Sequence, residues 1–281
     1  MRFLTLYGAH LRQQVGKIAG WGGALLVLAA YIVILHDAFM ESQEQFTGML
    51  SAYPPELMAA FGGSANLFEP AGFLNFTYFS YAAVLLGFLA ISLGAGLLSA
   101  DEERGRLELV AACPVSRMGL FLARLLAAAS AVAVILLLSW LAFVFTVPGT
   151  GLKSLSALDL ALPHVELLAF MLFFGGLALL LSQVLPSRAA AAGVASAYLL
   201  ASYVLYVLLQ MDDSLEALKP LSPLHAIKGG YAVDGLDGAK VAALAALAVA
   251  FIALAAWRFE VRDLRVSGEG SWPAWLARRA R

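Results

Sequence analysis

Six apolar runs dominate this sequence, and each is close to or above the length that a helix needs to cross a lipid bilayer. A bilayer core of about 30 Å requires about 20 helical residues. The chain is 62% hydrophobic and only 13% charged, whereas soluble domains carry roughly 25% charged residues. The runs lack the alternating polarity of a membrane β-barrel. The sequence therefore predicts an all-α integral membrane protein with six transmembrane helices, at residues 18–35, 76–100, 118–147, 165–185, 189–210 and 241–257.

Lysine and arginine are unevenly divided between the segments that join these runs. With the N-terminus placed inside, the inner segments hold 14 of the 18 Lys and Arg residues and the outer segments hold 4. Cytoplasmic loops carry an excess of these residues. We therefore expect both termini, and the segment between the second and third spans, to be cytoplasmic. In the outer loops we expect a short helix at 54–62 and further short helices within 211–240, between spans 5 and 6.

The first 17 residues have the pattern of an amphipathic helix. Leu4, Tyr7, Leu11 and Val15 share one face, opposite polar residues, as in a helix that lies in the membrane interface. The alternative is a terminus that simply leads into the first span. No cleavage site follows the first apolar run, so we expect that run to stay in the membrane. The predicted organisation is an amphipathic interface helix at 1–17, a six-span domain at 18–260 and a basic cytoplasmic tail at 261–281.

Several classes of function lack their characteristic residues here. Ionisable residues in the middle of a span mark proton or ion pathways, but Arg124 and Glu166 lie near span ends, where we expect them to snorkel to the interface. No HExxH or Walker A sequence occurs, which argues against a zinc enzyme and against ATP hydrolysis by this chain. A net charge of −1 provides no basic field for nucleic acid. The single cysteine, Cys113, excludes an internal disulfide.

Residues 100–117, with the sequence ADEERGRLELVAACPVSR, form the densest charge cluster of the chain. Glu, Arg and Leu are good helix formers, so we expect the second span to continue as a surface helix. Pro114 would end that helix near Ala112, and Ser116 is placed to cap the third span. Charges of alternating sign beside a Leu/Val stripe favour docking of another protein. The simpler alternative is a solvated loop without a partner.

The same residues resemble the signature of a known family. Residues 101–109, DEERGRLEL, and 114–117, PVSR, are similar to the pattern of the ABC type-2 (ABC-2) permeases, which have the type V ABC exporter fold. That pattern is an acidic run, Gly-Thr-Leu-Glu, a leucine-rich stretch and Pro-Val-Ser-Arg. Its place after the second span and the six-span layout fit as well. Arg106 departs from the pattern, because the family usually has threonine there.

The resemblance covers nearly the whole chain and implies a set of partners. Two permease subunits, as a homodimer or a heterodimer, would pair among the lipids of the inner (cytoplasmic) membrane of a prokaryote and bind two ABC ATPase subunits. ATP and magnesium would bind to the ATPase, so this chain would hold no cofactor and would not be an enzyme. A cytoplasmic coupling helix between spans 2 and 3 would sit in a cleft of the ATPase. Its implied contact and shaping residues are Glu102, Glu103, Gly105, Arg106, Leu107, Glu108, Pro114, Ser116 and Arg117.

Two patterns within the spans bear on packing and on substrate. Ala83, Gly87, Ala90 and Gly94 form a stripe of small residues, which allows close helix contact within one subunit or between subunits. Aromatic and hydroxyl side chains recur at helical spacing on spans 2 and 5 and could line an amphipathic substrate path, although tyrosines near span ends also serve as interface anchors. The residues of this predicted path are Tyr78, Tyr81, Phe88, Tyr198, Ser202 and Tyr206.

These features together predict the permease subunit of an ATP-driven transporter. The expected substrate of export is hydrophobic or amphipathic, such as a drug, a peptide antibiotic or a lipid. The alternative is a membrane-embedded regulatory or resistance module that binds the same ATPase without moving substrate. An integral membrane enzyme is disfavoured, since the sequence shows no polar cluster within the spans.

Overall fold

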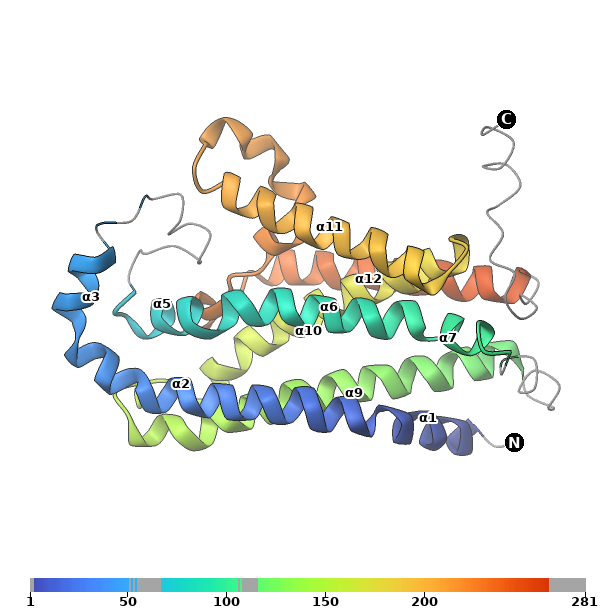
Figure 1. Ribbon diagram of the computed structural model, residues 1–281, viewed down its shortest axis with the longest axis horizontal. Helices are drawn as coiled ribbons and strands as arrows, with labels where there is room; N and C mark the ends of the chain where they lie inside the picture. The colour runs from blue at the N-terminus through green and yellow to red at the C-terminus, as the bar shows by residue number, and fades with distance from the viewer. Residues whose placement is uncertain are drawn as a thin grey trace.

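The computed structural model describes residues 3–50, 52, 54, 67–105, 107 and 116–262, and the regular structure of this part of the chain is entirely helical. Six helical segments are long and apolar enough to cross a membrane, which confirms an all-α membrane protein with six spans (Figure 1). The spans are α1 Phe3–Lys17 with η1 Ile18–Gly22 and α2 Gly23–Glu41; α5 Pro70–Leu74 with η2 Asn75–Phe79 and α6 Ser80–Gly96; α9 Arg117–Thr146 with η3 Val147–Gly149; α10 Ala157–Val184; α11 Arg188–Leu208; and α12 Gly238–Val261. The shorter described helices are α3 Gln43–Leu50, α7 Ser99–Glu102, η4 Asp213–Leu221, η5 Pro223–Ala226 and η6 Gly229–Asp234.

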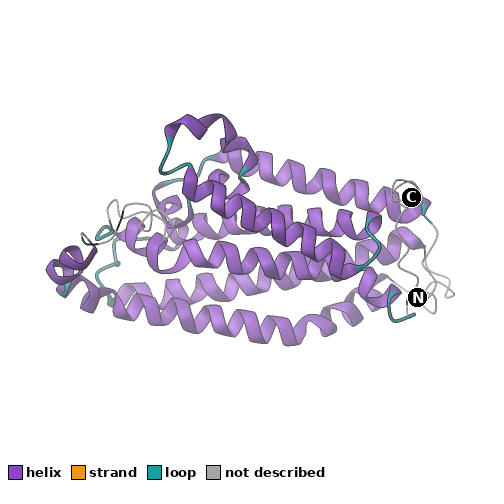
Figure 2. Cartoon of the chain, turned by 45° about the horizontal axis from the view of Figure 1, so that its top comes forward, coloured by secondary structure: helices purple, strands orange, loops and turns teal. Residues whose placement is uncertain are grey.

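The spans run side by side along the long axis of the molecule, as Figure 2 shows from a second direction. An even number of spans returns the chain to the end at which it began. The start of α1, the helix α7 and the last turn of α12 therefore lie together, at the right of Figure 1; we name this the motif end. The helices α3 and η4 to η6 lie at the opposite end, which we name the loop end. Which end faces the cytoplasm stays a prediction from the Lys/Arg distribution.

The central span is α10, which packs against α6, α9, α11 and α12. The outer spans α11 and α12 instead carry large apolar side chains that point away from the bundle, including Val204 at 56% exposure and Val249 at 66%. In a membrane protein such a face contacts lipid or another subunit. The three helices between the fifth and sixth spans are short and of the 3-10 type.

The N-terminal helix has no boundary where the sequence predicted one. The helix α1 passes through the π-helical turn η1 into α2, so residues 3–41 form one unbroken helix. Leu6 faces the bundle, and Tyr7 hydrogen-bonds to Ser130 of α9 over 2.9 Å between their hydroxyl oxygens. Leu4 and Val15, on the predicted apolar face, are 75% and 55% exposed. The predicted apolar face is therefore divided, because Tyr7 contacts the bundle while Leu4 and Val15 point away from it. Its position at a membrane interface stays a prediction.

The fourth span begins at Ala157 rather than at residue 165. Ser156 Oγ accepts the N–H of Asp159, while Asp159 Oδ2 accepts the N–H of Ser156. This capping box starts the helix. Glu166 consequently lies in about the third helical turn and is fully buried, so the expectation that it snorkels to the interface is wrong.

The small-residue stripe of α6 packs against neighbouring spans of the same chain. A Cβ atom added at Gly94 would lie 2.0 Å from the carbonyl oxygen of Gly175 in α10. One added at Gly87 would lie 2.8 Å from a methyl group of Leu199 in α11. Of the two interpretations of the stripe, the structure supports close helix contact within one subunit.

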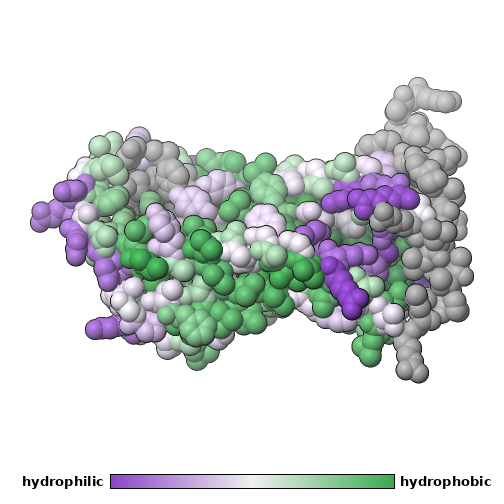
Figure 3. All heavy atoms as spheres, turned by 60° about the horizontal axis from the view of Figure 1, so that its bottom comes forward, coloured by the Kyte–Doolittle hydropathy of each residue, from purple (hydrophilic) through white to green (hydrophobic). Residues whose placement is uncertain are grey.

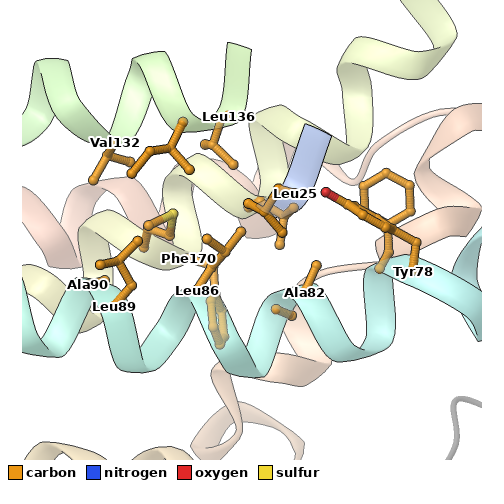
Figure 4. Close-up of a cluster of buried hydrophobic side chains, with 14 of the residues drawn as sticks. Leu25, Tyr78, Ala82, Leu86, Leu89, Ala90, Val132, Leu136 and Phe170 are labelled. Atoms are coloured by element: carbon orange, nitrogen blue, oxygen red, sulfur yellow. The ribbon is translucent and has the colours of Figure 1, made fainter. Parts of the chain in front are cut away.

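The same span contributes one side of the main hydrophobic core. Figure 4 shows Leu86 and Leu89 of α6 beside Phe170 of α10, with Val132 and Leu136 of α9 facing them. Lipid tails are as apolar as these side chains. The stabilising effect within the bilayer is therefore close packing rather than the removal of apolar surface from water.

We predict that Gly94→Ala destabilises the bundle, because a methyl group cannot fit against the backbone of α10 unless the two helices separate. The expected loss is roughly 1–3 kcal/mol, the usual cost of overpacking, measured as a lower midpoint of thermal unfolding in detergent. Gly193→Ala is the matched control, since an added Cβ there meets no atom within 4 Å and alanine favours helix. Equal midpoints for the two variants would contradict the packing described here.

Candidate functional site

The segment after the second span turns sharply at the motif end. The helix α6 ends at Gly96, and α7 follows after Leu97 and Leu98. The chain then turns at Gly105, whose φ of 65° is left-handed and strained for residues with a side chain. The N–H of Gly105 donates to the carbonyl oxygen of Glu102 at 2.9 Å. Gly105 thus makes the turn; its predicted contact with an ATPase stays a prediction.

A buried ion pair fastens α7 to the end of the sixth span. Arg262 Nη2 donates to Glu102 Oε1 at 2.7 Å, and Arg262 Nε donates to Gln183 Oε1 of α10 at 3.0 Å. Glu102 is 4% exposed and Arg262 is 9% exposed. The second carboxylate oxygen of Glu102 accepts no hydrogen bond from the described part of the chain. The side chain of Glu102 therefore points into the bundle rather than toward solvent.

A second, partly buried ion pair fastens α7 to the third span, and its arginine also contacts the first span. Arg124 of α9 donates from Nη2 to Asp101 Oδ2 at 2.7 Å and from Nη1 to the carbonyl oxygen of Leu97 at 2.9 Å. Its Nε donates to His10 Nε2 of α1 at 3.2 Å. Arg124 is 4% exposed, so the expectation that it snorkels to the interface is wrong. All three of its donor groups are used inside the protein.

Two polar contacts at helix ends complete the arrangement. Glu103 Oε1 accepts the N–H of Arg188 at 2.8 Å, which places a negative charge at the positive N-terminus of α11. Arg117 Nη1 donates to the carbonyl oxygen of Arg262 at 2.7 Å, which places a positive charge at the C-terminal end of α12. Ser116 Oγ accepts the N–H of Gly119 at 3.0 Å, and this confirms the predicted cap of the third span.

An apolar cluster covers these contacts. Leu107 is 1% exposed and packs with Leu98 after α6, Leu120 and Phe121 of α9, and Phe259 of α12. The exposed side chains of the described motif are Glu103, Arg104, Ser116 and Arg117. The predicted residues Arg106, Glu108 and Pro114, and with them the predicted helix end near Ala112, lie outside the described residues.

The charged segment is attached to the second span by the chain itself. Side-chain contacts attach it to the other five spans, and of these the contact to the fifth span is exposed. A family model described as ABC-2 family transporter protein matches residues 9–264. This chain belongs to the ABC-2 transporter family. The matched region begins within the first span and contains the other five spans and residues 99–107. The comparison with curated proteins finds no significant match. Membrane subunits of this family are not themselves enzymes.

The predicted substrate path of this ABC-2 protein does not form one surface. Tyr78 is buried, and its hydroxyl lies 2.6 Å from Ser139 Oγ, which lies 2.9 Å from His164 Nε2. His164 Nδ1 lies 2.8 Å from the carbonyl oxygen of Leu160 and must donate to it, because a carbonyl only accepts. Tyr78 therefore donates its hydroxyl proton to Ser139, and Ser139 donates to His164 Nε2. This chain of hydrogen bonds connects the second, third and fourth spans within the bundle.

The remaining path residues divide between separate places. Tyr198 donates to the carbonyl oxygen of Leu221 at 3.1 Å, and Ser202 Oγ lies 3.0 Å from Ser222 Oγ. Both hold the loop-end segment against α11. The other three are distributed as follows: Tyr206 lines a small pocket with Asn75 and Phe79, Phe88 packs on the hydrophobic core, and Tyr81 is 45% exposed.

Sequence reasoning missed a second buried carboxylate site, at the loop end. Glu166 Oε2 accepts the N–H groups of Lys228 and Gly229 at 2.7 and 3.1 Å, and Asn75 Oδ1 accepts the N–H of Gly230 at 3.0 Å. A Cβ at Gly230 would lie 2.2 Å from the backbone nitrogen of Asn75. In the sequence, the pair Gly229-Gly230 was the one sign of this site, since two adjacent glycines permit a close approach of the backbone. Among the described residues, no group of His, Cys, Asp or Glu could hold a metal ion.

We predict that breaking the Glu102–Arg262 pair from one side is far more damaging than replacing both partners. Glu102→Leu and Arg262→Met each leave a buried charge without its partner, at an expected cost of about 3–5 kcal/mol. The double variant Glu102→Leu with Arg262→Met should lose less than the sum of the two. Thermal unfolding in detergent measures the coupling.

The exposed pair Lys219–Glu216 provides the control for this comparison of single and double variants. Here Lys219→Gln should change the free energy of unfolding by less than about 1 kcal/mol. Strictly additive losses at Glu102 and Arg262 would show that the two side chains do not act as a unit.

Proposed function

We propose that this ABC-2 protein is the permease subunit of an ATP-driven transporter that exports a hydrophobic or amphipathic molecule. ATP and magnesium would bind to a separate ABC ATPase, present in two copies. The permease would pair with a second permease copy, most simply as a homodimer, in the cytoplasmic membrane of a prokaryote. Both termini and the motif end would face the cytoplasm, in agreement with the Lys/Arg distribution.

The observation that carries the proposal is the attachment of α7. Glu102 and Asp101 are bound in ion pairs to Arg262 and Arg124, two arginines that are themselves buried. The helix α7 therefore cannot shift alone without exposing or separating these charges. The adjacent Glu103 and Arg104 are exposed and available to a partner. A protein that displaces this segment would displace the ends of the first, third and sixth spans with it. Closure of an ATPase dimer could thereby bias the bundle between two arrangements.

The loop end provides support for an amphipathic substrate. A pocket of about 530 Å³ lies between α10, α11, the 3-10 helices and α12, and this volume is in the range of small-molecule sites. Phe173, Leu244 and Leu247 form apolar walls, and Tyr198, the one predicted path residue here, lies beside them. An apolar cavity with a polar rim suits a molecule with both kinds of surface.

The rim of this pocket carries lysine side chains whose positive charges are largely neutralised by neighbouring carboxylates. Lys219 pairs with Glu216 at 2.5 Å, and Lys240 pairs with Asp237 at 3.4 Å. Burial, together with the charges of Lys240 and Lys219, lowers the pKa of His225, so His225 is neutral near pH 7. The pocket therefore presents little net charge, in keeping with a substrate that is not strongly ionic.

A regulatory or resistance module that binds the ATPase without translocation is the second candidate function. It shares the α7 contacts and differs only in moving no substrate. Substrate-stimulated ATP hydrolysis and export in sealed vesicles separate the two, since the regulatory module would leave the substrate on its original side.

We predict that Glu103→Lys with Glu108→Lys uncouples the ATPase. Charge reversal at two acidic positions of the segment would repel a partner built for acidic side chains. Co-purification of the partner ATPase with the permease should fall at least about tenfold. The stimulation of ATP hydrolysis by the permease should fall to the same extent. Glu41→Lys with Glu44→Lys makes the same charge change at the loop end, where both residues are exposed, and should have no effect. Wild-type coupling in the first double variant would refute the proposed contact.

We predict that filling the loop-end pocket blocks transport but not ATPase binding. Leu247→Trp would occupy part of the cavity and should reduce, several-fold, the hydrolysis stimulated by a fluorescent amphipathic dye, with basal hydrolysis unchanged. Val27→Trp adds the same ring on an exposed face of α2 and serves as the control. Equal stimulation in both variants would place the substrate elsewhere.

A further inference from the structure

A polar pocket at the motif end is lined by an excess of positive charge. Its volume is about 380 Å³, and α1, α6, α7, α9 and α11 all contribute to its walls. Four cationic side chains line it, against one carboxylate, that of Asp101. The cationic residues are Lys17, Arg104, Arg124 and Arg188.

Only one of these cations is neutralised within the described part of the chain. Asp101 pairs with Arg124 at 2.7 Å, whereas the salt bridges of the described residues do not include Lys17, Arg104 or Arg188. The next carboxylate, Glu103, is bound to the backbone N–H of Arg188. Even with both carboxylates counted, the surroundings of the pocket hold two positive charges in excess.

Like charges converge here from different parts of the chain. Lys17 at the end of α1 and Arg188 at the start of α11 are close enough to repel each other, and the guanidinium group of Arg188 lies against Gly96 of α6. Figure 3 shows hydrophilic side chains near the motif end beside the apolar surface of the spans. Cations that repel one another at the edge of a low-dielectric region are stabilised when an anion enters between them.

We propose that this pocket binds a phosphate group, carried by an anionic lipid headgroup or by a soluble phosphorylated molecule. Arginine presents a planar fork of donors that matches phosphate oxygens, and Gln13 and Gln14 add amide groups to the same wall. The volume exceeds that of a bare phosphate and leaves space for the group to which the phosphate is attached. Leu93 and Leu97 provide an apolar margin.

Binding at this site adds a link between α1 and α11, which no ion pair of the described residues joins. A phosphate between Lys17, Arg104 and Arg188 bridges α1, the turn after α7 and α11. The site belongs to the chain itself, so binding is measurable without an ATPase and does not depend on the proposed transport function.

The test measures equilibrium binding to the full purified chain in a non-ionic detergent. The probes are inorganic phosphate, dioctanoyl phosphatidylglycerol and dioctanoyl phosphatidylcholine. We expect phosphatidylglycerol to bind at least about tenfold more tightly than phosphatidylcholine, and the affinity to fall as salt screens the charges. Lys17→Gln with Arg188→Gln should weaken phosphatidylglycerol binding by about tenfold or more. Lys153→Gln with Arg258→Gln removes the same charge at exposed positions outside both pockets and should leave this binding unchanged.

The outcomes separate the two sources of phosphate. Inorganic phosphate that displaces the lipid at comparable concentration assigns the site to soluble phosphorylated ligands, and lipid binding that phosphate does not disturb assigns it to a headgroup. Circular dichroism shows whether the double variant of Lys17 and Arg188 is folded. If it is not, Arg104→Gln replaces it, because Arg104 is exposed. This variant should weaken binding about threefold. Equal binding of phosphatidylcholine, no binding at all, or an equal loss in the Lys153 and Arg258 variant overturns the proposal.

Discussion

The structure of the motif end depends on two ion pairs with buried arginines, Glu102–Arg262 and Asp101–Arg124. Desolvating such charges is costly, and their attraction offsets the cost only when the geometry is good and the remaining donors are satisfied. Both conditions hold for the arginines: each donates to a carboxylate at 2.7 Å and also to a second acceptor. Buried pairs contribute little net stability, but they oppose any motion that would separate the charges. Through these pairs, the short segment after the second span is attached to several spans at once.

At the loop end, buried polar side chains are also paired, but their partners are backbone N–H groups. There one carboxylate, Glu166, accepts two backbone N–H groups, and Asn75 accepts a third. Neither contact needs a cationic side chain, because the backbone dipoles of the loop supply the positive partner. Between the two ends the spans are joined by apolar packing and by small residues such as Gly94 and Gly175. The bundle is therefore specified by polar contacts at its ends and by shape in its middle, as expected where lipid offers no hydrophobic driving force.

The candidate site was only partly visible in the sequence. Ser116 was correctly assigned as a cap because capping depends on residues three apart in the chain, and Gly105 is a turn for an equally local reason. Arg262 looked like one more residue of a basic tail, and Arg124 and Glu166 looked like surface charges at span ends. Their true partners lie 160, 23 and 62 residues away, respectively, and no periodicity in one helix reports a contact with another.

The sequence by itself determined the class of this protein: an all-α membrane bundle of six spans in the ABC-2 family, with one charged segment between the second and third spans. Hydrophobic length and local motifs suffice for that, because the bilayer requires each span to satisfy its own backbone hydrogen bonds. The tertiary structure alone decided which charges are buried, that α10 lies at the centre, that the stripe of small residues packs inside the subunit, and that four cations converge on one pocket. Those features depend on the relative rotation and depth of separate helices, which only their packing against one another determines.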